Sequence, residues 1–206
     1  MRGKANASLD LARCEELLGS VVAGKTGEWT PLVALLAPAL LSFATRSRSL
    51  GHRRSEDDCS DVMTAVLERL KKNDFRALQT FPSWREANPG KTLEDWLRIV
   101  TDRVACDYVT RKARATLLNT LGQALDSGIA PARTAMTDAQ AVRELVEHAD
   151  QELPKEQAHL LKRVLEGASA DTVARETGES RDQVERRLRA AYARLRRWVD
   201  DDASAA

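Results

Sequence analysis

Apolar residues recur every three or four positions along most of the chain, and short stretches rich in glycine, proline or charge interrupt them. This spacing places the apolar side chains on one face of an α-helix. The helices that it predicts cover residues 9–22, 30–46, 61–72, 93–114, 138–151, 154–166, 170–177 and 181–199. The pattern therefore predicts an all-α fold.

Residues that favour helix starts and stops lie at several of the predicted ends. We expect Ser8 to cap the first helix and Gly24 to end it, and Pro31 suits the first turn of the second helix. Residues 73–92 hold two prolines and a glycine between two helical patterns. They are predicted to form an ordered loop.

The helical pattern weakens between residues 115 and 137. This stretch is rich in Ala, Ser and Thr and contains Gly122, Gly128 and Pro131. Such a composition is typical of a flexible tether between domains. The sequence thus predicts two small helical domains joined by a linker at 115–137.

The composition agrees with a helical protein, because charged residues make up 31% of the chain and aromatic residues only 4%. Cys14, Cys59 and Cys106 lie far apart and form no C-x-x-C pair, so we expect three buried thiols in a reducing cytosol, without a disulfide, metal or cofactor. The start of the chain lacks the apolar segment of a signal peptide. The apolar run at 31–44 is short and contains Pro38, so a cytoplasmic protein with no membrane partner is predicted.

The string GSVVAGKT at residues 19–26 satisfies the pattern of a phosphate-binding P-loop, G-x-x-x-x-G-K-[ST]. A P-loop needs a buried strand before its glycines and a helix that starts at the Lys-Thr end. Here a charged helical pattern, LARCEELL, precedes Gly19, and Gly27 follows Thr26. We expect a chance match, and an NTPase remains an alternative only through this string.

Residues 169–197 have the pattern of a helix-turn-helix. Ser169 and Ser180 are suited to cap two successive helices, and Gly178 supplies the left-handed residue that a sharp turn between them requires. The apolar positions expected to face inward are Val173, Ala174, Val184 and Leu188.

The second helix of this motif is strongly basic. Residues 181–197 hold seven arginines against Asp182 and Glu185, a local charge of +5 in a chain whose formal net charge is +1. Such a cluster is the electrostatic footprint of nucleic-acid binding, and guanidinium groups can pair with guanine edges or phosphates. The candidate contacts are Arg181, Gln183, Arg186, Arg187 and Arg189. The alternative is a solvated basic face on a protein-binding helix bundle.

Three stretches of the chain, which follow one another in the order that the family has, resemble the sigma-70 family of bacterial transcription initiation factors, of the small extracytoplasmic-function type. The stretch 153–197 is similar to region 4 of that family, which opens with Leu-Pro and has Glu-Gly before the helix-turn-helix. WLRIVTDRVACDYVTRKAR resembles the end of region 2, and VVAGKTGEWTPLVALLAPAL resembles the start of the family. The matching residues are Leu153, Pro154, Glu166, Gly167, Trp96, Leu97, Asp107, Tyr108, Arg111, Ala23, Gly24, Trp29, Leu32, Ala37 and Pro38.

The resemblance implies a non-catalytic, cytoplasmic, nucleoid-associated subunit that binds core RNA polymerase and promoter DNA, with an anti-sigma factor as a possible partner. It implies an N-terminal helix and turn at 1–28, a region 2 domain at 29–114, the linker at 115–137, a region 4 domain at 138–199 and a tail at 200–206. Region 4 would read the −35 duplex through the five residues named above. The residues implied for the −10 element are Trp84, Lys91, Arg103, Arg111, Lys112 and Arg114, and those implied for the polymerase are Asp61, Met63 and Thr64.

The polymerase-binding helix departs from the pattern of that family. Where the family carries Asp-Leu-Val-Gln-Glu/Asp, residues 61–65 read Asp-Val-Met-Thr-Ala, which keeps the first acid and loses the Gln and the last acid. The family's Arg-Asn pair is replaced by Asp102-Arg103. A sigma-like DNA-binding regulator, or a partner-binding module that no longer initiates transcription, is therefore the alternative function.

Overall fold

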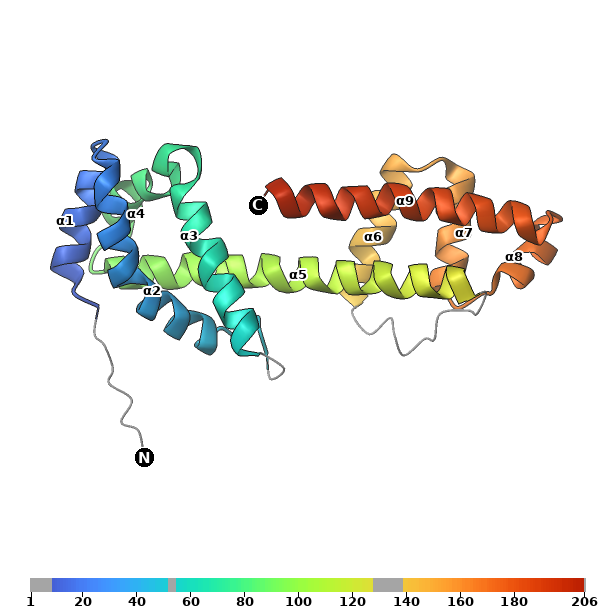
Figure 1. The fold of residues 1–206 in the computed structure, drawn as a ribbon, viewed down its shortest axis with the longest axis horizontal. Helices are drawn as coiled ribbons and strands as arrows, with labels where there is room; N and C mark the ends of the chain where they lie inside the picture. Colours follow the sequence, from blue (N-terminus) through green and yellow to red (C-terminus); the bar gives the residue numbers. More distant parts are fainter. Residues whose placement is uncertain (1–8, 52–54, 128–138, 206) are drawn as a thin grey trace, which may run out of the picture. The chain divides into compact units, whose positions relative to one another are not determined.

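A computed structural model describes residues 9–51, 55–127 and 139–205, with side chains up to Asp201. These residues are helical apart from turns, so the prediction of an all-α fold is confirmed for them (Figure 1). The elements are α1 (Leu11–Val22), η1 (Thr26–Glu28), α2 (Trp29–Arg46), α3 (Glu56–Gln79), α4 (Phe81–Ala87), α5 (Leu93–Ser127), α6 (Ala139–Glu152), α7 (Lys155–Leu165), α8 (Ala170–Thr177) and α9 (Arg181–Ala205).

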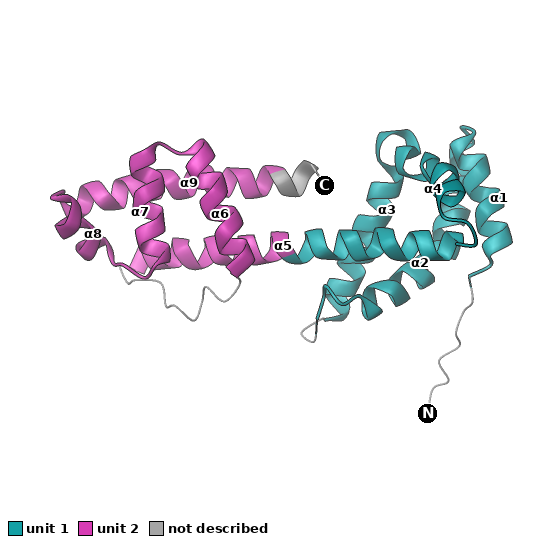
Figure 2. Ribbon diagram, turned by 180° about the vertical axis from the view of Figure 1, so that it is seen from behind, with its two compact units in different colours: residues 1–109 teal, residues 110–206 magenta. Residues whose placement is uncertain are grey.

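The chain divides into two compact units, and the division falls between Val109 and Thr110 (Figure 2). Unit 1 contains α1 to α4 and the N-terminal part of α5, and unit 2 contains the rest of α5 and α6 to α9. Each unit has its own cluster of buried apolar side chains. The two are described separately below.

The first two helices of unit 1 follow the predicted pattern closely. The Asp10 side chain accepts a hydrogen bond from the Arg13 N–H at 3.1 Å and so caps α1, whereas the predicted cap, Ser8, lies outside the described residues. α2 continues through the exposed Pro38 to Arg46. Leu32, Leu36 and Leu40 of α2 are fully buried in the core.

The ordered loop expected at 73–92 is mostly helical, which corrects the prediction. The backbone leaves helical geometry at Lys72, and Asn73, Asp74 and Phe75 have φ angles of 52°, 53° and 60°. The chain then resumes α3 up to Gln79 and forms α4. The aromatic rings explain this order, because Phe75 packs 5.3 Å from Trp29 and a buried Phe81 packs 5.5 Å from Trp96, centroid to centroid.

The structure corrects the first part of the linker prediction, because α5 continues through that segment. The helix predicted at 93–114 runs on to Ser127, and Leu117, Leu118 and Leu121 are buried in the core of unit 2. Gly122 is not a linker glycine: a Cβ atom there would lie 2.8 Å from the Tyr192 hydroxyl oxygen, so the absent side chain lets α9 approach. The rest of the expected linker, including Gly128 and Pro131, lies outside the described residues.

Helices α6, α7 and α8 begin and end within two residues of the predicted positions, and α9 begins as predicted but continues to Ala205 through most of the tail expected at 200–206. Their buried apolar residues are spaced by three or four positions, as in α9 at Val184, Leu188, Ala191, Leu195 and Val199. One face of α9 is thereby fixed in the core and the opposite face is exposed.

Three further expectations from the sequence concern the cysteines, the GSVVAGKT string and the apolar run. Cys14 and Cys59 are buried as expected, but Cys106 is exposed, because it lies on the outer face of α5. GSVVAGKT forms the end of α1, a turn at Gly24 and the start of η1, so among the described residues a helix and not a strand leads into the Lys-Thr, which agrees with the expected chance match. One helical stretch, Thr26–Arg46, is long and apolar enough to cross a membrane by composition alone, which core helices of soluble proteins also satisfy.

Candidate nucleic-acid interface

A sharp turn joins α8 to α9. The Ser169 hydroxyl accepts a hydrogen bond from the Thr172 N–H at 3.1 Å and caps α8. α8 ends at Gly178, whose φ of 72° is left-handed and whose N–H donates to the Ala174 carbonyl. Val173 and Val184 are fully buried on the two sides of the turn. The capping and turn residues thus form the helix-turn-helix that the sequence predicts.

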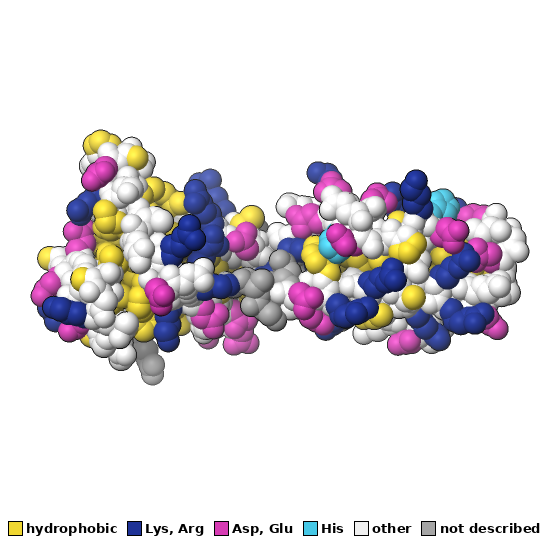
Figure 3. Space-filling model, turned by 90° about the horizontal axis from the view of Figure 1, so that it is seen from above, with side chains coloured by type: hydrophobic (Ala, Val, Ile, Leu, Met, Phe, Trp, Pro, Cys, Tyr) yellow, Lys and Arg dark blue, Asp and Glu magenta, His cyan; other side chains and the backbone are white. Residues whose placement is uncertain are grey.

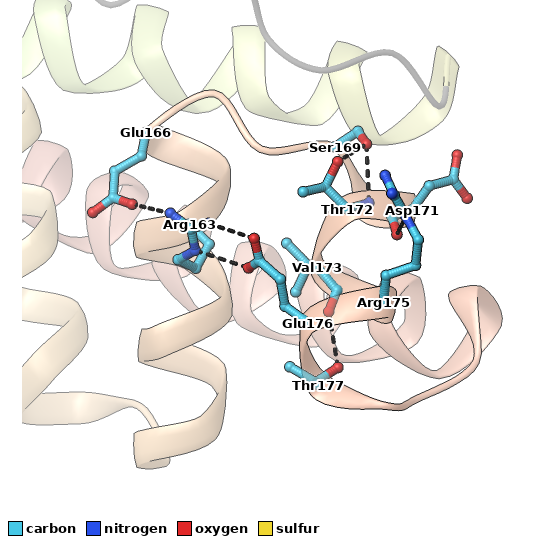
Figure 4. Close-up of polar contacts among 9 residues, drawn as sticks. All are labelled: Arg163, Glu166, Ser169, Asp171, Thr172, Val173, Arg175, Glu176 and Thr177. Atoms are coloured by element: carbon cyan, nitrogen blue, oxygen red, sulfur yellow. Dashed lines mark hydrogen bonds and ion pairs between the residues drawn. The ribbon is translucent and has the colours of Figure 1, made fainter.

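An ion pair fixes α8 against α7. Arg163 donates to Glu176 through Nη2 at 2.7 Å and through Nε at 3.1 Å, and its Nη1 donates to Glu166 at 2.5 Å (Figure 4). The hydrogen bonds from Arg163 lower the pKa of the Glu176 carboxyl below its usual value. The two-pronged contact holds the orientation of α8, and therefore the position of the turn into α9.

The outward face of α9 carries arginines toward its two ends and small residues between them. The burial pattern leaves Arg186, Ala190, Ala193 and Arg197 exposed, on the side of the helix away from the core. Arg189 and Arg194 are exposed beside this line. On the side of unit 2 seen in Figure 3, basic and acidic side chains are interspersed.

Arg181 lies at the start of α9 and contacts two carboxylates. Its Nε donates to Glu185 Oε1 at 2.8 Å, and its Nη1 lies 3.3 Å from Asp171 Oδ2 on α8. These contacts raise the pKa of the Arg181 guanidinium, with the Glu185 hydrogen bond as the largest cause. Arg181 therefore braces the helix-turn-helix in this structure.

Arg187 is turned toward the protein in the same way. Its Nη1 lies 2.7 Å from Glu179 Oε1 in the turn and 3.2 Å from Glu156 Oε2 on α7. The Glu179 side chain is only 24% exposed, and its Oε2 is buried without a hydrogen-bond partner. The partly buried carboxylate is thus compensated mainly by Arg187.

Gln183 acts at the helix start. Its Oε1 accepts hydrogen bonds from the Ser180 N–H at 3.0 Å and from the Ser180 hydroxyl at 3.1 Å, and its own N–H donates to the Ser180 hydroxyl at 3.3 Å. This is a capping box. A two-point contact of the Gln183 amide with adenine would require its carbonyl oxygen to give up these bonds to Ser180.

The outward arginines have weaker local partners. Arg186 and Arg197 donate through Nε to backbone carbonyls of Asp182 and Ala193, at 3.3 and 3.4 Å. Among the side chains that the structure describes, neither they nor Arg194 form an ion pair. Arg189 lies 3.8 Å from Glu185. Of the four arginines predicted to contact DNA, Arg186 is thus the one without a carboxylate partner among the described side chains, and Arg189 has only the long contact to Glu185.

The residues predicted for the −10 element fall in both units. Trp84, Lys91 and Arg103 belong to unit 1, where Lys91 and Arg103 are exposed and the half-buried Trp84 stacks on Phe81 at 6.3 Å. The remaining three, Arg111, Lys112 and Arg114, lie after the division, in unit 2. The structure therefore does not describe a single surface that contains all six.

Arg114 is an interior contact of unit 2. Its side chain is 13% exposed, its Nε lies 3.5 Å from Glu144 Oε2, and its guanidinium carbon lies 5.0 Å from the centre of the Trp198 ring. His148 stacks on the same ring at 3.8 Å. The Nε of the half-buried Arg111 is also buried. Burial corrects the expectation that Arg114 is available to DNA, while Lys112 is exposed.

The three residues predicted to bind the polymerase differ in availability. Thr64 is exposed, and Met63 is half-buried against the core of unit 1. The Tyr108 hydroxyl lies 3.0 Å from Asp61 Oδ2 and 2.8 Å from Asp58 Oδ1, and burial together with these carboxylates raises the Tyr108 pKa. Asp61 thus has an internal partner.

Sequence reasoning missed the carboxylates that pair with the arginines of α9. Glu185 and Arg181 are four residues apart on one helix, a spacing that the sequence displays. Glu156 and Arg187 are thirty-one residues apart and meet only because α7 packs beside the turn, so no sequence signal identifies them. Within the described ranges, no group of His, Cys, Asp and Glu side chains is arranged to hold a metal ion.

Comparisons with protein-family models, with curated proteins and with solved structures returned no match to this chain.

Proposed function

We propose that this chain is a sigma factor of the extracytoplasmic-function type, which binds core RNA polymerase and directs it to specific promoters. The observation that carries the proposal is the outward arginine face of α9, presented behind the left-handed turn at Gly178. A helix-turn-helix places its second helix in the major groove. Unit 2 would therefore bind the −35 element as duplex DNA.

The shape of the α9 face supports this mode of binding. An α-helix with side chains is about 10–12 Å wide and the major groove is about 12 Å wide, so a close fit requires small residues in the middle of the face. Ala190 and Ala193 are exposed between the arginines. Arg186 near the start of α9 would reach base edges, and Arg194 and Arg197 would contact phosphates.

Unit 1 would contact the polymerase and capture the melted −10 element. Extracting a base from the stack costs on the order of a few kcal/mol, which stacking on aromatic rings and contacts to phosphates can offset. The half-buried Trp84 and the exposed Lys91 and Arg103 supply these chemical groups. The polymerase contact would involve the exposed Thr64 and the edge of Met63.

A second function, a DNA-binding regulator or partner-binding module that does not initiate transcription, is favoured by one specific observation. The carboxylate of Asp61, the one acid retained in the implied polymerase-binding segment, lies 3.0 Å from the Tyr108 hydroxyl. A polymerase that binds this carboxylate would have to share it with Tyr108. The second function keeps the role of α9 and removes that of α3.

Run-off transcription with core RNA polymerase and a library of promoter templates tests the proposal. We expect products from a subset of templates, and we expect the Arg186→Gln, Arg197→Gln double variant to lose them while Arg143→Gln retains them. Arg143 is an exposed arginine of α6 and controls for loss of positive charge. Duplex binding without any product would leave only the regulator or module, and absence of both would reject both functions.

A further inference from the structure

Two arginines of α9 differ from the rest in their surroundings. Arg181 and Arg187 each contact two carboxylates, and these four acids come from α7, α8, the turn and α9 itself. The outward arginines, Arg186, Arg194 and Arg197, lack such partners among the described side chains. Arg189 and Arg196 lie between these cases, with one carboxylate each, so the basic cluster that looks uniform in the sequence is divided by its surroundings.

We propose that the carboxylates around Arg187 act as internal competitors of DNA phosphate and so limit the affinity of α9 for nucleic acid. This inference rests on the proposed binding of duplex DNA by α9. Glu179 and Glu156 approach the same nitrogen, Nη1 of Arg187, from the turn and from α7, at 2.7 and 3.2 Å. A phosphate oxygen that binds this nitrogen must replace at least one of them, because the two N–H groups of Nη1 already face two carboxylates.

The consequence for salt dependence follows from ion release. An arginine that neutralises a phosphate releases about 0.9 condensed cations from duplex DNA, which steepens the fall of affinity with salt. When Arg187 exchanges a carboxylate for a phosphate, the freed carboxylate regains its own cation atmosphere, and the net release is smaller. Arg194 has no such exchange to make. It contributes the full ion release if it contacts a phosphate.

The competition also sets the order in which residues contribute to binding. The outward arginines supply the attraction to any duplex, whereas Arg187 leaves its carboxylates only where the duplex offers a well-placed phosphate or base edge. Arg187 thereby favours a closely fitting complex over a loosely bound one. We infer that the acids lower affinity for nonspecific DNA more than affinity for a preferred site.

A double-mutant cycle on duplex binding tests this role of the carboxylates. The probe is a pool of 25-base-pair duplexes of random sequence, and the dissociation constant of the full chain is measured across a series of salt concentrations. The first pair of variants is Glu156→Gln with Glu179→Gln. We expect affinity to rise by about twofold to fivefold beyond the rise produced by Glu147→Gln, the range that exposed ion pairs span. Glu147 is an exposed residue of α6, and because its variant changes the charge by one and the pair changes it by two, its effect on log affinity is doubled before the comparison.

The second arm of the cycle adds Arg187→Gln to each background. We expect it to weaken binding and flatten the salt slope more in the Glu156→Gln, Glu179→Gln background than in the wild type. Arg194→Gln should have equal effects in both backgrounds. Because Glu179 is partly buried, circular dichroism checks folding, and Glu156→Gln alone repeats the test at a side chain that is 75% exposed.

The outcomes separate this inference from the proposed function. Equal effects of Arg187→Gln in the two backgrounds would overturn the competition, while binding of the duplex by α9 would stand. An absence of duplex binding by the wild type and by the neutralised variants would overturn both. A larger effect in the neutralised background, with Arg194→Gln unchanged, supports the competition.

Discussion

Units 1 and 2 are both small helical clusters, but they differ in the balance of ring contacts and ion pairs between their helices. In unit 1 the rings of Trp29 and Phe75, and of Phe81 with Trp84 and Trp96, have centroids 5.3 to 6.3 Å apart, and the ion pairs described between its helices are Arg69–Asp107 and Arg85–Glu15. Arginines also lie over its rings, including Arg98 over Phe43 at 5.2 Å. The ring–ring contacts involve no charged group, so salt screens them little.

Unit 2 instead connects most of its helices through ion pairs. The pairs between different helices are Arg114–Glu144, Lys162–Asp150, Arg163–Glu176, Arg181–Asp171 and Arg187–Glu156. Its one described ring stack joins His148 to Trp198. The comparison teaches that a basic sequence is not the same as a basic surface, because unit 2 uses part of its positive charge to position its own helices.

The largest expected effect concerns the part of α5 that belongs to unit 2. Gly122→Pro should destabilise unit 2 by about 3 kcal/mol or more, because proline removes a helix hydrogen bond and clashes with the preceding turn. Hydrogen exchange followed by mass spectrometry should show faster exchange in α5 beyond Thr110 and in α9, with the amides around α2 unchanged. Unaltered exchange in unit 2 would restore the linker prediction for this segment.

Replacing Arg114, whose side chain is 13% exposed, should give the next largest change in stability. Arg114→Met leaves Glu144 without its ion pair and removes the cation over Trp198, and we expect a loss of about 1–3 kcal/mol. Urea unfolding monitored by circular dichroism measures it. Arg103→Met, an exposed residue of unit 1, is the matched control and should change stability by less than about 0.5 kcal/mol. Equal stabilities of the two variants would argue against an interior role for Arg114.

Salt should change the stability of the two units differently, by a smaller amount. Raising sodium chloride from low to moderate concentration screens the interhelical ion pairs of unit 2 more than the ring contacts of unit 1. Thermal unfolding followed by exchange at amides of each unit should show unit 2 losing stability relative to unit 1. The comparison fails if both units respond to salt alike.

The smallest expected effect is a pH dependence from His148. Burial against Trp198 lowers the pKa of His148, and Arg114 lowers it further while Glu152 raises it. Because the unfolded chain then binds a proton more readily than the folded one, the contribution of His148 is fully present above the unfolded pKa of about 6.5 and is lost as the pH falls through the lower folded value. His148→Phe keeps a ring on Trp198 and should flatten the fall in melting temperature of unit 2 between pH 7.5 and 5.5. A fall of the same size in the variant would assign it to other groups.

The sequence predicts the helix-turn-helix well because its boundaries depend on local chemistry. Ser169, Gly178 and Ser180 determine the start and stop of α8 and the start of α9 through contacts within a few residues. The segment after residue 115 is different. Gly122 reads as a helix breaker, but its lack of a side chain is required by Tyr192, seventy residues away, and that contact is invisible before the fold is known.

The candidate site divides in the same way. Arginine density on α9 is a property of the sequence, so the basic face is predictable. Which guanidinium groups remain available depends on acids brought close by packing, as Glu156 is brought to Arg187. The burial of Arg114 depends on packing in the same way. It lies at a basic helix end in the sequence, but it becomes an interior contact once α6 and α9 pack on α5.

The salt dependence of duplex binding tests the central claim, that the outward arginines of α9 contact nucleic acid, most directly. We predict that wild-type chain binds duplex DNA with a steep fall in log affinity against log salt. The Arg186→Gln, Arg194→Gln, Arg197→Gln variant should reduce this slope by about 2, because each of the two phosphates that Arg194 and Arg197 no longer neutralise lowers it by roughly 0.9. Arg143→Gln should leave the slope unchanged. An unchanged slope in the triple variant, or no binding by the wild type at low salt, would contradict the claim.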